Sequence, residues 1–325
     1  MDIELLWERA RIIREIRSFF DTRGYLETDT PLLAPDLIPE SCLEVFETSR
    51  IFPAGGTKKP YWLIPSPEIW MKRLIARHRT NLYQICKCFR NGESSGHLHS
   101  PEFTMLEYYT MDADYGDSLK LTEDLFAALL GGREFPGPLV PPFLRITVEE
   151  AFARWAGFNL YEAAGEGTLE AEARKLGLDP PAGLGTAGLY DLIFIHTVEP
   201  SLPRDRPVAL LDYPAFVPCL AKKHPGGKTV ERWELYVRGI ELANCYSEET
   251  DAGAVRRFFA SEAKAKETAL VPHAVDGDYW KIFLPPPGGH PFPRCSGTAL
   301  GLDRLIMALT GRRRVDGVIP FPMGF

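Results

Sequence analysis

Two arginines far apart in the chain stand where a guanidinium can reach a bound anion. Arg90 follows the apolar run from Leu82 to Phe89 and opens a polar loop. Arg304 follows Gly301, at the point where a glycine-punctuated strand turns into an apolar helix. A guanidinium presents paired donors in one plane that fork onto a phosphate, and the first amides of a helix also attract anions. Two such groups predict a site for a triphosphate bound between them.

The hydrophobic pattern predicts the elements that must position these arginines. The run before Arg90 and the return through Phe103 and Met105 predict a hairpin with charge at its tip. In the second segment, Gly297 and Gly301 allow the backbone to approach a ligand closely. An ordinary charged surface hairpin is the alternative for the first segment, because charged loops are common.

Composition limits the classes of function. The chain has 325 residues, of which 45% are hydrophobic and 25% are charged, as in ordinary soluble proteins. Its net charge of −7 is a poor electrostatic footprint for a long nucleic acid, whose affinity usually rests on a basic surface. The runs 312–314 and 222–223 are local basic patches, and each is also compatible with a solvated face.

The cysteines and the N-terminus indicate a compartment. The six cysteines form no Cys-x-x-Cys pair, and the seven histidines do not supply the spacing of a zinc site. We expect all six cysteines as reduced thiols, with Cys86 and Cys88 on one face of a strand. The N-terminus lacks a signal core, and no apolar run approaches the length of a membrane span. We therefore expect a cytoplasmic protein with no membrane contact.

Helix and strand patterns predict an α+β fold in which one domain covers residues 1–325. Helices are predicted over 5–23, from Pro67 and Glu68 onward, over 118–130 with Ser118 as the cap, and over 250–268. Strands are predicted over 44–52, 61–64, 207–217 and 233–246. Short helical patterns broken by glycines predict a helical insertion at about 145–205, after a proline-rich linker.

Three ordered segments resemble the signature motifs of class II aminoacyl-tRNA synthetases. The Arg90 hairpin resembles motif 2, and the segment Gly301-Leu302-Asp303-Arg304 resembles motif 3. The helix and strand around residues 7–33 are similar to motif 1, and Pro31 matches its proline. The resemblance implies an antiparallel sheet flanked by helices, and the motif 1 part implies a homodimer.

Within this family the lysyl enzymes are the most similar. The strings 101–107, 113–115 and 241–244 resemble the lysyl pattern. The resemblance covers roughly residues 5–130 and 230–323 and is weaker between them. It implies activation of lysine, or of a lysine isomer, by ATP.

The resemblance implies that ATP binds in a bent form with Arg90 and Arg304 as the catalytic residues. Arg90 would contact the α-phosphate and the incoming carboxylate, and Arg304 the γ-phosphate end. Catalysis is then mainly positioning and charge neutralisation, because the attacking carboxylate is already ionised at neutral pH. The implied ATP contacts are Arg90, Asn91, Glu93, His99, Ser100, Phe103, Glu241, Leu242, Gly301 and Arg304.

The resemblance also implies that Glu241 and Glu248 bind Mg²⁺, which prefers hard oxygen ligands and substrate phosphates. A regular strand would put these two residues on opposite faces, so we expect the strand to bulge or end between them, near Asn244-Cys245. Two ordinary surface glutamates are the alternative.

The implied amino acid pocket must hold a long cationic chain. Acidic side chains and an aromatic wall suit an ammonium group. Glu107 and Tyr109 are two residues apart and share a strand face, although simple core packing is the alternative for the tyrosines. The implied substrate contacts are Ser66, Glu68, Glu107, Tyr109, Asn244, Tyr246 and Glu248.

Two departures from the family pattern concern the ATP site. Gly92 intervenes after Asn91, so that the loop to His99 is longer and Glu93 aligns with the adenine-contacting glutamate. Ser100 stands where the family commonly has asparagine, and its hydroxyl has a shorter reach. Both departures bear on the strength of ATP binding and leave the reaction type unchanged.

The position of motif 1 distinguishes between members of the family. Its helix is predicted within the first ten residues, so we expect no anticodon-binding domain and no contact with a tRNA anticodon. Ser66 supports the same interpretation, since lysyl-tRNA enzymes tend to have alanine there and the protein-modifying relatives tend to have serine. The chain therefore resembles the stand-alone paralogs that transfer (R)-β-lysine or lysine to a lysine ε-amine of elongation factor P.

Two other functions stay open from the sequence. One is a compact enzyme that charges tRNA or another small acceptor with lysine. The other is a non-catalytic regulatory paralog, against which the intact Arg90, Glu241, Glu248 and Arg304 argue. No residue is predicted as the base that deprotonates the acceptor amine.

Overall fold

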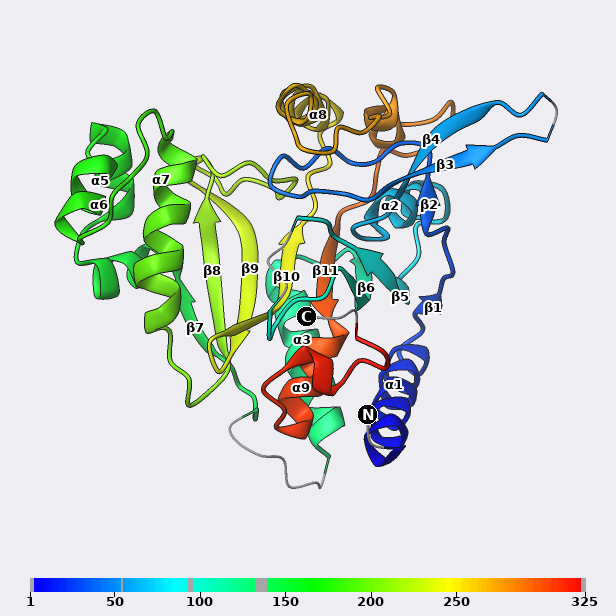
Figure 1. The fold of residues 1–325 in the computed structure, drawn as a ribbon, viewed down its shortest axis with the longest axis horizontal. Coiled ribbons are helices and arrows are strands. Elements are labelled where there is room, and N and C mark those ends of the chain that lie inside the picture. Colours follow the sequence, from blue (N-terminus) through cyan, green and yellow to red (C-terminus); the bar gives the residue numbers. More distant parts are fainter. Residues whose placement is uncertain (1–2, 54, 93–95, 132–138, 323–325) are drawn as a thin grey trace.

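A large mixed sheet runs through the centre of the molecule (Figure 1). The computed structural model describes residues 3–53, 55–92, 96–131 and 139–322. Eight strands are hydrogen-bonded in the order β1-β5-β6-β11-β10-β9-β8-β7. They are β1 (Leu26–Glu27), β5 (Leu82–Phe89), β6 (Glu102–Met111), β7 (Leu144–Thr147), β8 (Val208–Pro214), β9 (Thr229–Val237), β10 (Ile240–Ser247) and β11 (Cys295–Gly301).

The predicted antiparallel sheet is confirmed for the six central strands and is wrong for the two edges. The edge strand β1 pairs with β5 in parallel, and β7 pairs with β8 in parallel. Parallel neighbours need a crossover connection, whereas antiparallel neighbours can be joined by a tight turn. The segments between β1 and β5 and between β7 and β8 provide these crossovers, and the second one contains the helices between Val148 and Ser201.

One face of the sheet is covered by the helices α1 (Ile3–Asp21), α3 (Tyr115–Leu130) and α9 (Leu302–Thr310). Their apolar residues form one buried cluster with the central strands, which includes Phe20, Tyr108 and Trp233. The predicted cap of α3 at Ser118 is wrong. Asp114 caps this helix with a reciprocal capping box to Asp117, because the helix begins three residues earlier than the apolar pattern does.

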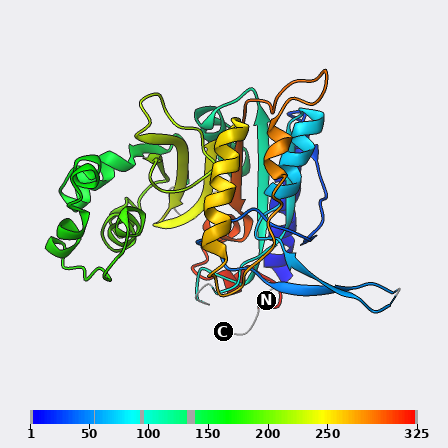
Figure 2. The ribbon, with the colours of Figure 1, turned by 90° about the horizontal axis from the view of Figure 1, so that it is seen from above.

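A group of short helices lies beside the β7–β8–β9 side of the sheet and extends away from the rest of the molecule (Figures 1 and 2). They are α4 (Val148–Ala151), η1 (Phe152–Ala156), α5 (Leu160–Glu166), α6 (Leu169–Lys175), α7 (Thr186–Ile193), η2 (Phe194–Val198) and η3 (Glu199–Ser201). They occupy the segment for which the sequence predicts a helical insertion. That this segment is an insertion in the domain stays a prediction.

The single strand predicted over 233–246 is wrong, because a tight turn divides it into β9 and β10. Arg238 and Gly239 both have positive φ, of 55° and 76°. A two-residue hairpin turn with both central residues at positive φ matches the twist of the strands it joins. The turn is not evident in the sequence, because the hydrophobic pattern continues on both sides of it and Arg-Gly is a weaker turn signal than Asn-Gly.

A second, small sheet has the order β2-β4-β3. Its strands are β2 (Leu33–Ala34), β3 (Glu47–Ile51) and β4 (Lys58–Leu63), and the β3–β4 ribbon projects from the body in both views (Figures 1 and 2). The helices α2 (Glu68–His78) and α8 (Ala252–Lys266) and the 3₁₀ helix η4 (Tyr279–Phe283) pack together, and a further 3₁₀ turn, η5 (Val315–Gly317), follows α9. No helix in the described ranges is both long and apolar enough to cross a membrane.

Candidate active site

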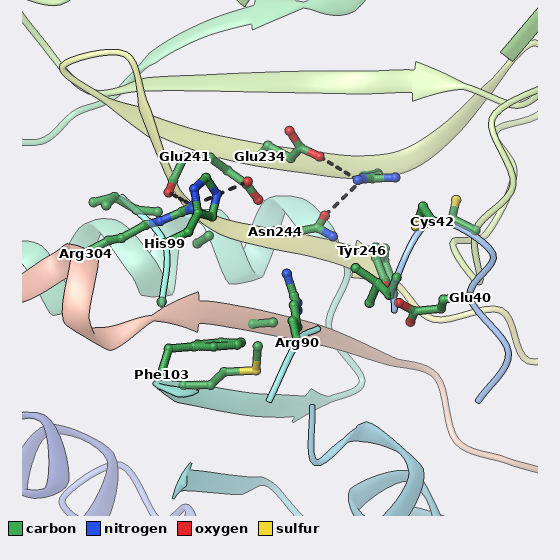
Figure 3. Close-up of a pocket in the computed structure, with 18 of the residues that line it drawn as sticks. Glu40, Cys42, Arg90, His99, Phe103, Glu234, Glu241, Asn244, Tyr246 and Arg304 are labelled. Carbon is green, nitrogen blue, oxygen red and sulfur yellow. Dashed lines mark hydrogen bonds and ion pairs between the residues drawn. The ribbon is translucent and has the colours of Figure 1, made fainter. Parts of the chain in front are cut away.

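Arg90 and Arg304 line the same cavity, which has a volume of about 590 Å³ (Figure 3). That size is typical of sites for drug-sized ligands and nucleotides. The two arginines come from different elements, since Arg90 directly follows β5 and Arg304 lies in the first turn of α9. The fold therefore brings these two arginines to one cavity, as the sequence predicted. We call this space the outer cavity.

Arg304 is fixed at one end of the outer cavity by its own neighbours. Its Nη1 donates to the Glu241 carbonyl at 2.8 Å, and its Nε donates to the Leu98 carbonyl at 3.2 Å. The Glu241 carboxylate lies 3.7 Å from the same Nη1. A guanidinium held in this way is preorganised to receive an anion without moving.

Arg90 lies between the sheet and the centre of the outer cavity. Its backbone amide donates to the Pro101 carbonyl at 3.0 Å, which closes the neck of the β5–β6 hairpin. The guanidinium carbon lies 5.2 Å from the centre of the Phe103 ring, within cation–π range. Figure 3 shows Arg90 pointing into the pocket toward Asn244.

Most of the predicted ATP contacts line the outer cavity. Asn91 does not, because its amide donates to Glu44 and its side chain to the Val45 carbonyl, so that it holds the neighbouring loop. Glu93 lies outside the described residues. The predicted residues that do line the cavity are Arg90, His99, Ser100, Phe103, Glu241, Leu242, Gly301 and Arg304.

A smaller cavity of about 90 Å³ adjoins the outer one, and we call it the inner cavity. Glu40, Arg90 and Tyr246 are among the residues that line both cavities, so the two spaces meet there. Every residue predicted to contact the amino acid lines the inner cavity. These residues are Ser66, Glu68, Glu107, Tyr109, Asn244, Tyr246 and Glu248.

A buried lysine, which sequence reasoning missed, anchors two of the inner carboxylates. Lys72 is 1% exposed, and its Nζ lies 2.5 Å from Glu68 and 2.6 Å from Glu248. Burial alone would lower the pKa of Lys72, but these two carboxylates raise it well above its ordinary value. The spacing of Glu68 and Lys72, four residues apart on α2, was the available signal.

The inner cavity holds more carboxylates than Lys72 can neutralise. Tyr109 donates its hydroxyl to Glu107 Oε1 at 2.8 Å, which confirms that the two side chains share a strand face. Burial, followed by the Glu68 charge, raises the pKa of Glu107 well above its usual range. Within the described residues, Glu107 Oε2 and Glu248 Oε1 are buried and accept no hydrogen bond. Such oxygens predict a cationic ligand, because a buried unpaired carboxylate is costly.

Gly297 creates the space of the inner cavity. A Cβ at this position would lie 2.5 Å from Tyr109 Cε1 and would also collide with the Glu248 carboxylate. At Gly301 a Cβ would meet its nearest atom, the Leu242 carbonyl, at 3.6 Å, which is an ordinary contact. The close approach predicted for both glycines is therefore required by the protein's own packing only at Gly297.

The two predicted magnesium ligands line different cavities, Glu241 the outer one and Glu248 the inner one. The register of β10 shifts between Glu241 and Ala243, and the strand ends at Ser247, so the expected irregularity exists but begins before Asn244. Burial, followed by the Glu234 charge, raises the pKa of Glu241 to about 7. A divalent cation would relieve this carboxylate, so Glu241 fits Mg²⁺ better than the Lys72-bound Glu248 does.

A buried network on β9, also missed in the sequence, completes the wall of the outer cavity. Arg232 donates to Glu234 at 2.5 Å and to Asn244 Oδ1 at 3.1 Å. Glu234 also accepts the hydroxyls of Tyr213 and Tyr236, each at 2.6 Å. This network fixes the orientation of the Asn244 amide, which faces both cavities.

Further polar groups of the wall come from the loop before β3. Glu40 and Cys42 lie on the side of the outer cavity opposite Arg304 and Glu241 (Figure 3), and Ser41 also lines the cavity. The Ser41 amide donates to Glu262 on α8 at 2.8 Å, and Lys266 on the same helix donates to the Leu43 carbonyl. All six cysteines are free thiols, and the sulfurs of Cys86 and Cys88 lie 3.8 Å apart on one strand face, as predicted.

The fold and the paired arginines define a class II aminoacyl-tRNA synthetase domain. The family model described as "tRNA synthetases class II (D, K and N)" matches residues 3–324. The chain belongs to this family. Within the described residues, no group of three or more histidine, cysteine, aspartate or glutamate side chains is arranged to hold a metal ion by itself.

Curated proteins that match nearly the whole chain include several named Elongation factor P–(R)-β-lysine ligase. The one from Avibacterium paragallinarum is 35% identical over 98% of this chain and 95% of its own length. The one from Vibrio atlanticus is 36% identical over 98% of this chain and 96% of its own length. The one from Mannheimia succiniciproducens is 34% identical over the same 98% of this chain.

Proposed function

We propose that the chain activates (R)-β-lysine or lysine with ATP as an aminoacyl-adenylate and transfers the acyl group to a lysine ε-amine of elongation factor P. The observation that carries this proposal is the meeting of Arg90 and Arg304 in one cavity that opens into a carboxylate-lined pocket. The names of the relatives support the choice of amino acid and acceptor.

In the activation step, the amino acid carboxylate attacks the α-phosphorus of ATP, so two anions must meet. Arg90 borders both cavities and would neutralise the carboxylate and the α-phosphate together. Arg304, at the far end of the outer cavity, would bind the terminal phosphates. Mg²⁺ held by Glu241 and phosphate oxygens would supply further charge neutralisation there.

The amino acid would lie in the inner cavity with its ammonium groups against the buried carboxylates. Glu68, Glu107 and Glu248 carry three negative charges when ionised, and Lys72 offsets one of them, while Glu40 and Arg90 at the border with the outer cavity offset each other. A lysine isomer brings two positive charges, so the filled pocket is close to neutral. The two unpaired carboxylate oxygens, on Glu107 and Glu248, support this binding mode.

An ATP–pyrophosphate exchange assay with lysine and (R)-β-lysine tests the activation step. We expect exchange with at least one of the isomers, whereas its absence with both would contradict the proposal and favour a non-catalytic role. Labelled amino acid is then offered to elongation factor P and to bulk tRNA in parallel. Stable label on elongation factor P supports the proposed acceptor. With this acceptor, we propose that the reaction takes place in the cytoplasm. Label on tRNA alone would contradict elongation factor P as the acceptor and identify tRNA as the acceptor instead.

We also propose that the chain forms a homodimer through the α1–β1 region. Trp7 and Ile3 on α1 and Leu26 on β1 are 67%, 63% and 57% exposed. Since β1 is also the edge of the large sheet, these side chains and an open edge lie in one region. The mass in solution tests this, and we expect Trp7→Glu to shift a dimer toward a monomer without unfolding it.

A further inference from the structure

The point where the outer and inner cavities meet is where the acyl carbon of the adenylate must lie. The nucleotide part would fill the outer cavity and the amino acid part the inner one. An attacking amine has to reach this carbon, and it is an ammonium ion at neutral pH. A proton acceptor is therefore needed at the junction.

Only three ionisable side chains in the described part of the chain line both cavities, and they are Glu40, Arg90 and Tyr246. Arg90 stays protonated, because a guanidinium does not lose its proton in a protein. Burial raises the pKa of Tyr246 well above 10, so this phenol stays neutral and holds its proton. The Glu40 carboxylate is the remaining group that can accept one.

We propose that Glu40 is the general base that takes a proton from the ε-ammonium of the acceptor lysine, an inference that rests on the proposed function. The free amine forms a C–N bond with the acyl carbon, and the bond from that carbon to the AMP oxygen breaks. The electron pair leaves on the phosphate oxygen. The second nitrogen proton passes to the departing AMP or to water, so amide, AMP and two protons are formed in all.

The position of Glu40 in the fold suits this role. It lies on the loop between β2 and β3, whereas Arg90 and Arg304 belong to other elements, so this loop forms a separate side of the pocket (Figure 3). The next residue, Ser41, is tied to Glu262 of α8. Cys42, two residues on, is exposed, which indicates that this side of the pocket is open to an incoming side chain.

The charges around Glu40 favour a base that works near neutral pH. Burial and the Glu68 carboxylate raise its pKa to about 7, while Arg90, Lys72 and Arg232 lower it. Tyr246 stays neutral because burial raises the pKa of its phenol, and the thiol of Cys42 stays neutral because local desolvation and the Glu40 charge raise its pKa. General bases are most effective when their pKa lies near the working pH.

The test compares Glu40→Gln with wild type in two separate steps. We expect ATP–pyrophosphate exchange to stay within about twofold, because activation needs no base. We expect acyl transfer from preformed adenylate to elongation factor P to fall by about 10²–10⁴-fold, the usual contribution of a general base. Asp36→Asn is the matched control, since Asp36 lies on the same loop, has a raised pKa and lines neither cavity.

A second pair of acceptors tests the inference without the protein acceptor. Methylamine is protonated at neutral pH, whereas hydroxylamine is not and needs no base. We expect Glu40→Gln to lose transfer to methylamine and to keep hydroxamate formation. Glu40→Asp, with a displaced carboxylate, should recover part of the methylamine rate.

The outcomes that overturn the inference are distinct. If Glu40→Gln loses exchange as much as transfer, Glu40 binds the amino acid instead. If its transfer rates and their pH dependence equal those of wild type, the base lies elsewhere. If wild type transfers to methylamine but not to elongation factor P, the proposed acceptor fails while the inference about Glu40 survives.

Discussion

The outer and inner cavities solve opposite electrostatic problems on neighbouring parts of one sheet. The outer cavity must attract phosphates, and its fixed cations, Arg90 and Arg304, lie at a hairpin neck and a helix start. The inner cavity must attract ammonium groups, and its carboxylates Glu107 and Glu248 lie on or directly after sheet strands and are buried. The two arginines of the anion site thus lie at the ends of elements, whereas two carboxylates of the cation site belong to the sheet and a third, Glu68, begins α2.

The difference between the cavities explains why each needs a different support. Arg304 is held by two carbonyls and one neighbouring carboxylate, Arg90 lies beside the Phe103 ring, and both arginines remain partly accessible. The inner carboxylates would repel one another in a buried space, and Lys72 holds two of them together. Function in the outer cavity therefore depends on individual side chains, and in the inner cavity it depends on a balanced set.

Removing the balancing charge is expected to have the largest effect. Lys72→Met would leave Glu68 and Glu248 buried without their cation, and we expect a loss of about 3–5 kcal/mol in the free energy of unfolding. Denaturant unfolding of the free protein measures this loss. The double variant Lys72→Met with Glu248→Gln should recover a large part of it, because one of the unpaired charges is then absent. Equal stability of wild type and Lys72→Met would show that the three groups do not act as a set.

The outer cavity is expected to respond in activity and not in stability. Arg90→Ala and Arg304→Ala should each lower kcat/KM for ATP–pyrophosphate exchange by about 10²–10³-fold, or about 3–4 kcal/mol in the barrier. Arg90→Lys should restore only part of this, because an ammonium cannot fork onto two oxygens. Exposed Arg312 lines neither cavity, and Arg312→Ala is the control that should leave exchange unchanged. Equal activity of Arg90→Ala and Arg312→Ala would remove the basis for a nucleotide in this cavity.

The sequence predicted the outer cavity better than the inner one, and the reason is physical. An arginine after a strand or at a helix start has a local signature, so Arg90 and Arg304 could be found without coordinates. The hairpin, the strand β11 and the helix α9 around them are confirmed. The resemblance also predicted the residues that line the inner cavity, but not what balances their charge.

The features that were missed depend on contacts between distant segments. Lys72 on α2 meets Glu248 directly after β10, and the loop that carries Glu40 is tied to α8 through Ser41. The turn at Arg238-Gly239 and the parallel edge strands likewise follow from chain path and not from hydrophobic period. Asn91 lies outside the lining of the outer cavity, because its side-chain amide holds a loop while its neighbour Arg90 lines the cavity.

Gly297 gives a smaller test of the inner cavity alone. In Gly297→Ala the new methyl group meets the buried Tyr109 ring, and we expect about 1–3 kcal/mol of destabilisation from overpacking. The KM for the amino acid should rise far more than the KM for ATP, because the outer cavity is untouched. Gly301→Ala has room for its methyl group and should leave the stability of the unliganded protein unchanged. A rise in both KM values of Gly297→Ala to the same extent would mean that the cavities are not separable.

The smallest expected effect is a dependence of amino acid binding on pH, and it separates the cavities once more. Burial raises the pKa of Glu248 to about 7, although Lys72 lowers it, so this carboxylate is partly protonated just below neutral pH. Because the folded pKa lies above the ordinary 4.5, the group contributes stability that is complete below about 4.5 and is lost as pH rises through about 7. A cationic amino acid needs the ionised form, so its affinity should rise by up to about fivefold from pH 6 to pH 7, by about a further twofold to pH 8, and then level off. Calorimetric titration with lysine should show this rise with proton release, Glu248→Gln should flatten it, and an affinity that falls over this interval would contradict a cation site built on Glu248.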